Sequence, residues 1–247
     1  MVFERYLDMT TVRSIVDIMY PNRCWCCDRL MAKNDPGFCA LCEHTVIEQP
    51  HCCARCGAPI ESSDQQTIPR CGPCQYKPNK ALAYCWWAME YGGAIQKAIQ
   101  KMKFGRQWTL AVELAQLMQP HPQQQQLILE WDAVVPVPMH WRTRMVRGFN
   151  QSTMLARAIA SRLHIPVLIG SLNKHRHTAR QTTLSAKQRT TNLAGVFSIN
   201  KPDTIAKKRL LLVDDVVTTG TTIQACARTL KAANARSVDA WSVCRKL

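Results

Sequence analysis

Two adjacent carboxylates and a threonine-rich loop lie close together near the C-terminal end of the sequence. Asp214 and Asp215 follow the apolar run 210–213, which has the character of a strand buried on both faces of a parallel sheet. After them comes a loop with free amides, hydroxyls and one glycine: Thr218, Thr219, Gly220, Thr221 and Thr222. Backbone N–H groups at a helix N-terminus favour a phosphate, whereas carboxylates suit sugar hydroxyls or a bridging magnesium ion. The combination predicts a site for a ribose 5-phosphate group.

This pattern resembles the phosphoribosyl pyrophosphate (PRPP) binding motif of type I phosphoribosyltransferases, with Val216 and Val217 at its two variable positions. The resemblance implies that Asp214 and Asp215 act at the ribose hydroxyls as catalytic residues. It also implies that residues 216–222 surround the 5'-phosphate and that Mg²⁺ accompanies PRPP. The alternative is an ordinary buried strand followed by a threonine-capped helix, which leaves the acidic pair unexplained.

A second group of residues with metal-binding chemistry consists of four CxxC pairs within residues 24–74. Each CxxC pair brings two thiolates of one tight turn to a single metal, and two pairs complete a tetrahedral zinc site. Sequential pairing predicts two structural sites, formed by Cys24, Cys27, Cys39 and Cys42 and by Cys53, Cys56, Cys71 and Cys74. Structural zinc contributes on the order of 10 to 16 kcal/mol, enough to fold a segment with few large apolar residues. Because cysteine fills all four positions, neither zinc is expected to be catalytic.

Some alternatives to these ligand sets remain open. Cys26 and Cys52 lie beside proposed ligands, and His44 and His51 are further candidates that break the spacing. A disulfide scaffold is the competing account of the cysteines, and it needs an oxidising compartment. We expect instead a reducing, cytoplasmic setting, because the sequence shows neither a secretory signal nor an apolar run long enough to cross a membrane.

The composition bounds the class of protein and its domains. A chain of 247 residues with 47% hydrophobic residues can hold one α/β domain and a small module. We predict an N-terminal helix in residues 1–23, a double zinc ribbon in 24–78 and a phosphoribosyltransferase-like domain in 79–247. The ribbon carries four basic and six acidic residues between Cys24 and Cys74, which favours a structural or protein-docking role over DNA binding.

The net charge of +15 is concentrated elsewhere. The segment 133–202 contains no Asp or Glu but eleven Lys and Arg residues. Such a field attracts polyanions, which include pyrophosphate, PRPP and nucleic acid. A basic face that serves only solubility is the alternative, although solubility does not require the exclusion of every acid.

The order of apolar patterns predicts alternating strands and helices and thus a mainly parallel sheet. Strands are expected at 84–90, 132–137, 165–169, 210–213 and 238–243, and helices at 94–103, 109–118, 151–163 and after residue 222. Arg142, Arg144 and Arg147 then lie in a connection that resembles the pyrophosphate loop of phosphoribosyltransferases. The polar stretch 171–195, which contains Arg176 and Arg180, corresponds to the mobile catalytic loop of that family.

Taken together, the sequence resembles the ComF family of competence proteins, including the GntX group of bacterial DNA-utilisation proteins. The CxxC pairs, KFGR at 103–106, RGFNQS at 147–152 and VDDVVTTGTT at 213–222 carry this resemblance. It implies a type I phosphoribosyltransferase fold behind a double zinc ribbon, in a cytoplasmic protein that acts in the uptake or use of extracellular DNA.

Three hypotheses follow from this resemblance. In the first, the protein binds PRPP and handles incoming single-stranded DNA with a helicase partner, through phosphate neutralisation and base stacking on Trp141 or Phe149. In the second, it is a Mg-dependent phosphoribosyltransferase that moves phosphoribose from PRPP to an unknown acceptor. In the third, it senses PRPP without chemistry and docks a partner through the ribbon.

Overall fold

A computed structural model describes residues 21–32, 37–46, 52–60, 70–76, 81–105, 107, 109–118, 130–175 and 195–247. The predictions for the N-terminal helix up to residue 20, for His51 and for Arg176 and Arg180 fall outside these ranges.

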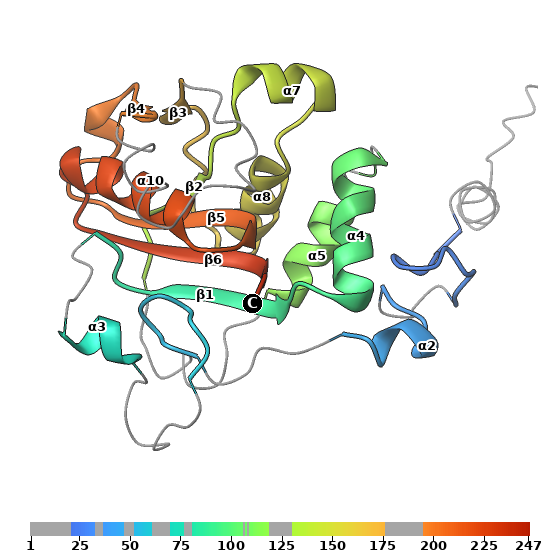
Figure 1. Ribbon diagram of the computed structural model, residues 1–247. Helices are drawn as coiled ribbons and strands as arrows, with labels where there is room; N and C mark the ends of the chain where they lie inside the picture. Colours follow the sequence, from blue (N-terminus) through green and yellow to red (C-terminus); the bar gives the residue numbers. More distant parts are fainter. Residues whose placement is uncertain are drawn as a thin grey trace, which may run out of the picture.

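A four-stranded parallel sheet forms the centre of the larger domain (Figure 1). Its strands are β1 (Cys85–Glu90), β2 (Ala133–Pro136), β5 (Arg209–Val217) and β6 (Ser237–Arg245), in the order β1-β6-β5-β2. Every neighbouring pair is parallel, which confirms the predicted sheet type. Because the carboxyl ends of parallel strands meet at one edge, the residues that end β2 and β5 lie together there.

Helices cover both faces of this sheet. On one face, α4 (Gly93–Phe104), α5 (Leu110–Leu117) and α8 (Gln151–Leu163) pack against Leu211 and Val213 of β5. On the other face, α10 (Thr221–Ala232) and the hairpin of β3 (Leu172–Lys174) and β4 (Phe197–Ile199) pack against Leu210 and Leu212. All four of these β5 side chains are fully buried, which confirms a strand covered on both faces. The 3₁₀ turn Pro202–Thr204 leads into β5.

The predicted strand at 165–169 is wrong. Val167 forms only a single parallel bridge with Val134, outside any named strand. Pro166 has no N–H to donate to a ladder, and Gly170 turns the chain with a φ of 74°. The polar stretch expected to correspond to a mobile loop from residue 171 contains β3, which begins at Leu172 and pairs antiparallel with β4.

The connection after β2 also differs from the prediction. Residues expected to form a loop make a short helix, α7 (Trp141–Arg147). The Nδ1 atom of His140 accepts a hydrogen bond from the backbone amide of Arg142 at the start of this helix, and Gly148 ends it with a φ of 85°. A capping side chain and a glycine in the left-handed region are ordinary helix boundaries, which explains why the basic segment is helical.

Each zinc ribbon begins with the same tight turn. In the first, Arg23 pairs with Leu30, and in the second Cys52 pairs with Pro59. The residue after the first CxxC of each ribbon has a positive φ, 62° at Asp28 and 70° at Gly57. The later CxxC pairs lie at the short helices α2 (Ala40–Glu43) and α3 (Gly72–Tyr76). The two ribbons are therefore repeats of one local structure.

The two ribbons contact different parts of the larger domain, as Figure 1 shows by the positions of α2 and α3. In the first ribbon, Trp25 packs into the core beside α4 and α5, and Asp28 pairs with Lys101 at 2.6 Å. In the second, the carbonyl of Ala54 accepts a hydrogen bond from the amide of Cys85 at 2.9 Å, at the start of β1. The second ribbon thus covers part of an edge strand that would otherwise expose unpaired backbone groups.

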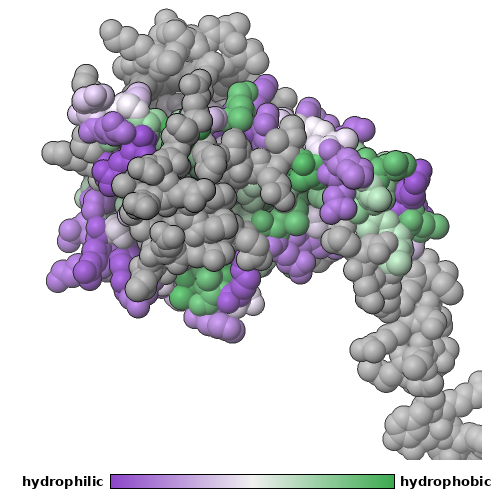
Figure 2. All heavy atoms as spheres, turned by 90° about the horizontal axis from the view of Figure 1, so that it is seen from below, coloured by the Kyte–Doolittle hydropathy of each residue, from purple (hydrophilic) through white to green (hydrophobic). Residues whose placement is uncertain are grey.

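The surface seen from below, on the side of β1, is mixed in character. Figure 2 shows hydrophilic side chains over much of the described surface on this face, with smaller hydrophobic groups between them. Within the described ranges, no helix combines the length and the apolar character needed to span a bilayer.

Candidate phosphoribosyl-binding site and zinc centres

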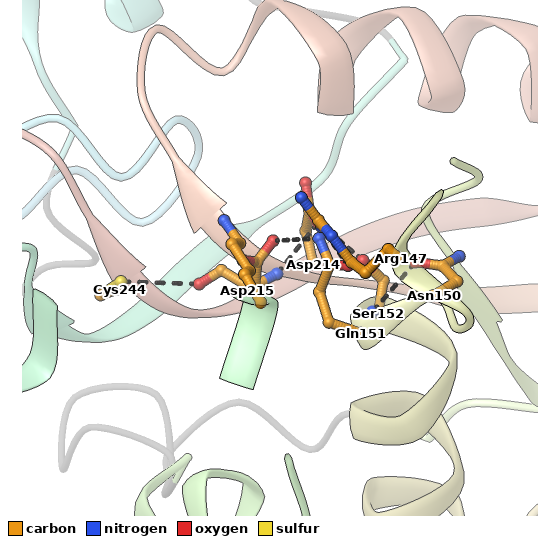
Figure 3. Close-up of polar contacts among 8 residues, drawn as sticks. Arg147, Asn150, Gln151, Ser152, Asp214, Asp215 and Cys244 are labelled. Atoms are coloured by element: carbon orange, nitrogen blue, oxygen red, sulfur yellow. Dashed lines mark hydrogen bonds and ion pairs between the residues drawn. The ribbon is translucent and has the colours of Figure 1, made fainter. Parts of the chain in front are cut away.

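The acidic pair lies near the end of β5, beyond the point where β2 stops. Pro136, the last residue of β2, pairs with Val213, while β5 continues through Asp214 and Asp215 to Val217. The side of β5 left open by β2 is filled by the first residues of α8, which point at the carboxylates in Figure 3. Asn150 begins α8: its side chain accepts a hydrogen bond from the amide of Ser152 and donates one to the carbonyl of Val137.

Asp214 is partly buried and retains a route to solvent. Its Oδ1 atom accepts hydrogen bonds from the Ser152 hydroxyl at 2.8 Å and from the amide of Asp215 at 3.0 Å. Burial, and next the negative charge of Asp215, raise the pKa of Asp214 to about 7. This carboxyl can therefore change its protonation state near neutral pH.

Asp215 is only 4% exposed. It forms an ion pair with the Lys103 ammonium of α4 and accepts a hydrogen bond from the Gln151 amide at 3.3 Å. Burial by itself raises the pKa of Asp215, but Lys103 and then Gln151 more than offset it, so the pKa falls below its usual range. The thiol of Cys244 donates to the Asp215 carbonyl at 3.6 Å, as Figure 3 shows.

A cavity of about 230 Å³ lies in front of the two carboxylates. Side chains from four segments line it: Val137, Pro138, Met139, His140, Thr143, Asn150, Gln151, Ser152, Lys174, Asp214 and Asp215. Lys174, on β3, has a pKa lowered by burial, although the charges of Cys226 and Asp214 act to raise it. The cavity thus combines carboxylates, hydroxyls, amides and one ammonium group, which is the donor and acceptor set of a sugar-phosphate site.

The predicted phosphate-binding loop connects β5 to α10. Gly220 adopts a φ of 73° and directly precedes the helix, which no side chain caps and whose first turn has no acidic residue. The hydroxyls of Thr219 and Thr221 lie 2.6 Å apart. Residues 218–222 are not among those that line the cavity, but the helix N-terminus beside them offers free amides to an anion.

The three arginines predicted near the site differ in position. Arg147 donates to the Gln151 side chain at 2.7 Å and lies over the Phe104 ring at 5.4 Å, so it supports the residues around Asp215. Arg142 lies over the Trp141 ring at 5.3 Å. Arg142 and Arg144 are exposed on α7 and do not line the cavity.

Sequence reasoning missed three side chains that contact the acidic pair: Lys103, Gln151 and Ser152. All three fall inside KFGR and RGFNQS, the segments that carried the family resemblance, but no role was given to them. Their link to Asp214 and Asp215 is visible only in the fold, because α4, α8 and β5 are far apart in sequence.

The eight predicted zinc ligands form two clusters. Within each tetrad the four Sγ atoms lie within 4.8 Å of one another, in the predicted sets. The Sγ atoms of Cys27 and Cys39 lie 3.7 Å apart, and those of Cys56 and Cys71 lie 3.6 Å apart. A tetrahedral zinc with Zn–S bonds of about 2.3 Å needs sulfur separations of about 3.8 Å, so both clusters fit this metal.

In the first tetrad, hydrogen bonds favour a thiolate at Cys24, whereas burial and the neighbouring thiols raise the pKa of Cys42. The amide of Cys39 donates to the Sγ atom of Cys24 at 3.4 Å. Burial alone raises the pKa of Cys24, but backbone donors, including Cys27 and Cys39, more than offset it and lower the pKa to about 6. Cys26, Cys52 and His44 belong to neither tetrad.

Comparison with known proteins finds two family models that match different parts of the chain. A phosphoribosyl transferase domain model matches residues 150–247, and a double zinc ribbon model matches residues 15–75. The larger domain therefore has a phosphoribosyltransferase-type α/β fold, and the N-terminal part is a double zinc ribbon.

Full-length relatives and solved structures extend the comparison. The chain is 31% identical to the DNA utilization protein YhgH of Escherichia coli (strain K12), over 92% of this chain and 98% of that protein. It is 30% identical to Competence protein F of Haemophilus influenzae, over 87% and 92% respectively. A solved glutamine PRPP amidotransferase from B. subtilis is 23% identical with a TM-score of 0.35, over 55% of this chain and 25% of that one. Because both of these relatives match over most of their length, the chain belongs to the family of DNA utilization protein YhgH and Competence protein F.

Proposed function

We propose that the larger domain binds PRPP together with Mg²⁺ and that the protein uses this site in the utilisation of incoming DNA. The observation that carries the proposal is the position of Asp214 near the end of β5, where it faces a polar cavity, with the uncapped N-terminus of α10 following after the short loop 218–220. A carboxylate accepts hydrogen bonds from ribose hydroxyls, and the amides of a helix N-terminus donate hydrogen bonds to a phosphate. The short loop between β5 and α10 sets the spacing of these two groups.

Mg²⁺ would accompany the pyrophosphate of PRPP and offset its negative charge. Lys174 lines the cavity, and the basic residues of α7 belong to the helix whose Thr143 also lines it. The acid-free segment 133–202 keeps this side of the cavity positive.

The DNA part of the proposal is supported by the names of the relatives and by the surface of α7. Trp141 is 56% exposed beside Arg142 and Arg144, and a flat aromatic side chain with neighbouring guanidinium groups suits single-stranded DNA. We also propose a cytoplasmic location, because two zinc ribbons need eight reduced thiols.

Isothermal titration calorimetry with PRPP and Mg²⁺ tests the proposed binding of PRPP. The wild type is expected to bind, and Asp214→Asn is expected to weaken binding at least 30-fold because the ribose loses a charged acceptor. Arg236→Gln is the matched control, since Arg236 lies before β6 at the opposite end of the parallel sheet. No heat from the wild type, or equal affinity in Asp214→Asn, would contradict the proposed site.

Fluorescence anisotropy with a labelled oligo(dT) tests the DNA part. Binding is expected to weaken as salt rises, and Trp141→Ala combined with Arg144→Gln is expected to reduce affinity about tenfold at low salt. Arg236→Gln serves again as the control for a general loss of positive charge. An affinity for oligo(dT) that does not change with salt would contradict the proposed DNA binding. The proposed binding of PRPP would still stand. A parallel assay for pyrophosphate release separates a transferase from a protein that only binds PRPP.

A further inference from the structure

The two carboxylates of the acidic pair occupy different environments, although they are adjacent in sequence. Asp214 faces the cavity, and its two hydrogen bonds, both to Oδ1, come from Ser152 and from the amide of Asp215. Asp215 is nearly fully buried and engages Lys103 and Gln151 with its side chain. Asp215 also lines the cavity, so the two carboxylates differ in burial and in the charge of their partners, not in the number of their contacts.

The partners of Asp215 are themselves held in place. Lys103 follows Met102, a fully buried residue of α4, and the next residue, Phe104, lies under the Arg147 guanidinium. Arg147 in turn donates to the Oε1 atom of Gln151, whose amide group donates to Asp215 (Figure 3). The ends of α4 and α7 and the start of α8 thus form one connected polar network around a single carboxylate.

Two adjacent buried carboxylates would ordinarily share one proton, because two negative charges at short range are costly away from water. The ammonium of Lys103 pairs with Asp215 and so offsets mainly the negative charge of that carboxylate. Its charge favours ionised Asp215, while Asp214 keeps a pKa raised by burial and by its neighbour. The titratable groups that interact electrostatically with Asp214 are Asp215, Lys103, Lys174, Cys226 and Cys244.

We propose that Lys103 is a positioning residue that holds the Asp215 carboxylate in an ion pair within the protein. Asp214 is then the carboxylate that contacts the ribose hydroxyls. The inference rests on the proposed PRPP binding and refines it, since the sequence pattern alone assigns both carboxylates to the sugar. Lys103 acts through Asp215 and does not itself touch the ligand.

A double-mutant cycle measured by calorimetry with PRPP and Mg²⁺ tests the division of roles. Lys103→Met is expected to weaken PRPP binding at least tenfold, because it leaves Asp215 uncompensated beside Asp214. Adding Asp215→Asn to Lys103→Met is expected to recover at least threefold, because the unpaired charge is removed. Lys103→Arg is expected to stay within threefold of the wild type. Lys97→Met, at an exposed position on the same helix, is the control.

Two results would overturn the inference. If Lys103→Met binds PRPP like the wild type, Lys103 has no positioning role. If the double variant binds more weakly than Lys103→Met, Asp215 contacts the ligand directly. Thermal unfolding of each variant, compared with that of Lys97→Met, shows whether a loss of binding reflects loss of the fold.

A measurement without ligand separates this inference from the proposed function. Carbon-13 NMR of the side-chain carboxyls is expected to show Asp214 titrating near neutral pH in the wild type, with Asp215 ionised throughout that range. In Lys103→Met the two carboxyls are expected to titrate together, and Lys103→Arg is expected to restore separate titrations. An unchanged titration in Lys103→Met refutes the role of Lys103 even if PRPP binds. Absence of PRPP binding in the wild type refutes the proposed function and the assignment of Asp214 to ribose, and the titrations still test the effect of Lys103 on Asp215.

Discussion

The guanidinium of Arg245 donates a hydrogen bond to the carbonyl of Cys56 at 2.7 Å. Arg245 is the last residue of β6, and Cys56 is a member of the second cysteine tetrad. The neighbouring residue Lys246 donates its backbone amide to the carbonyl of Val217, the last residue of β5. One end of the sheet is therefore joined both to a zinc ribbon and to the start of the phosphate-binding loop.

Arg245→Met is expected to destabilise the protein by about 1 to 2 kcal/mol, because a charged donor to a buried carbonyl is lost. Urea denaturation followed by tryptophan fluorescence measures the change, since Trp87 packs beside the same ribbon and donates to the Gly57 carbonyl. Lys246→Met, at an exposed neighbour, serves as the control. An equal effect in both variants would show that the hydrogen bond to Cys56 does not contribute.

Replacement of a single ligand is expected to remove one of the two zinc ions. Cys39→Ala and Cys71→Ala each leave a tetrad with three thiolates, whereas Cys26→Ala leaves both tetrads complete. Native mass spectrometry should therefore find one tightly bound zinc in each of the first two variants and two in Cys26→Ala. Loss of zinc from Cys26→Ala would show that Cys26 replaces one of the assigned ligands.

The contribution of Asp214 and Asp239 to the stability of the folded protein is expected to fall as the pH rises from about 4 to about 7. The pKa of Asp214 is raised to about 7 and that of Asp239 to about 6, mainly by burial, so the folded state holds protons that the unfolded state releases in this range. Asp215, with its lowered pKa, acts in the opposite direction at acid pH.

Asp214→Asn tests this dependence. The substitution is expected to stabilise the protein at pH 8 by on the order of 2 kcal/mol relative to wild type, and by much less at pH 4.5. Denaturant midpoints across this pH range measure the difference. A constant difference between the two proteins at every pH would show that the pKa of Asp214 is not raised by folding.

Gly220→Ala is expected to cost about 1 to 2 kcal/mol of stability and to weaken phosphate binding. The φ of 73° at this position disfavours a side chain, even though only Val217 lies within 4 Å of the added Cβ atom. Gly92→Ala is the matched control, because Gly92 precedes α4 with an extended φ of −164° and has open space around it. Thermal melts and calorimetry with PRPP compare the two variants.

Local spacing explains which parts of the molecule could be predicted from the sequence. The pairs of cysteines, the buried strand before Asp214 and the helix Gln151–Leu163 each depend on residues close together in the chain, and the structure confirms them. The strand at 165–169 failed because an apolar run was given more weight than Pro166. Helix α7 was missed because its cap is a histidine, which is an uncommon capping residue.

The contacts of the acidic pair could not be predicted in the same way. Lys103, Gln151 and Asp215 come from three elements, and only the packing of α4 and α8 on one face of the sheet brings them together. No periodicity marks which lysine of α4 reaches β5, since Lys97, Lys101 and Lys103 all suit an exposed basic helix. Their different roles follow from what each side chain faces in the fold.

Helix α4 carries two ion pairs only two residues apart. Lys101 pairs with Asp28, which follows the first CxxC turn, and Lys103 pairs with Asp215. A helix of twelve residues packed through buried Ile95, Ile99 and Met102 moves as a unit. Replacement of the first ribbon by an unrelated module would remove the contact at Lys101 and shift the ammonium group of Lys103 beside Asp215. Such a link favours inheritance of the two domains as one unit.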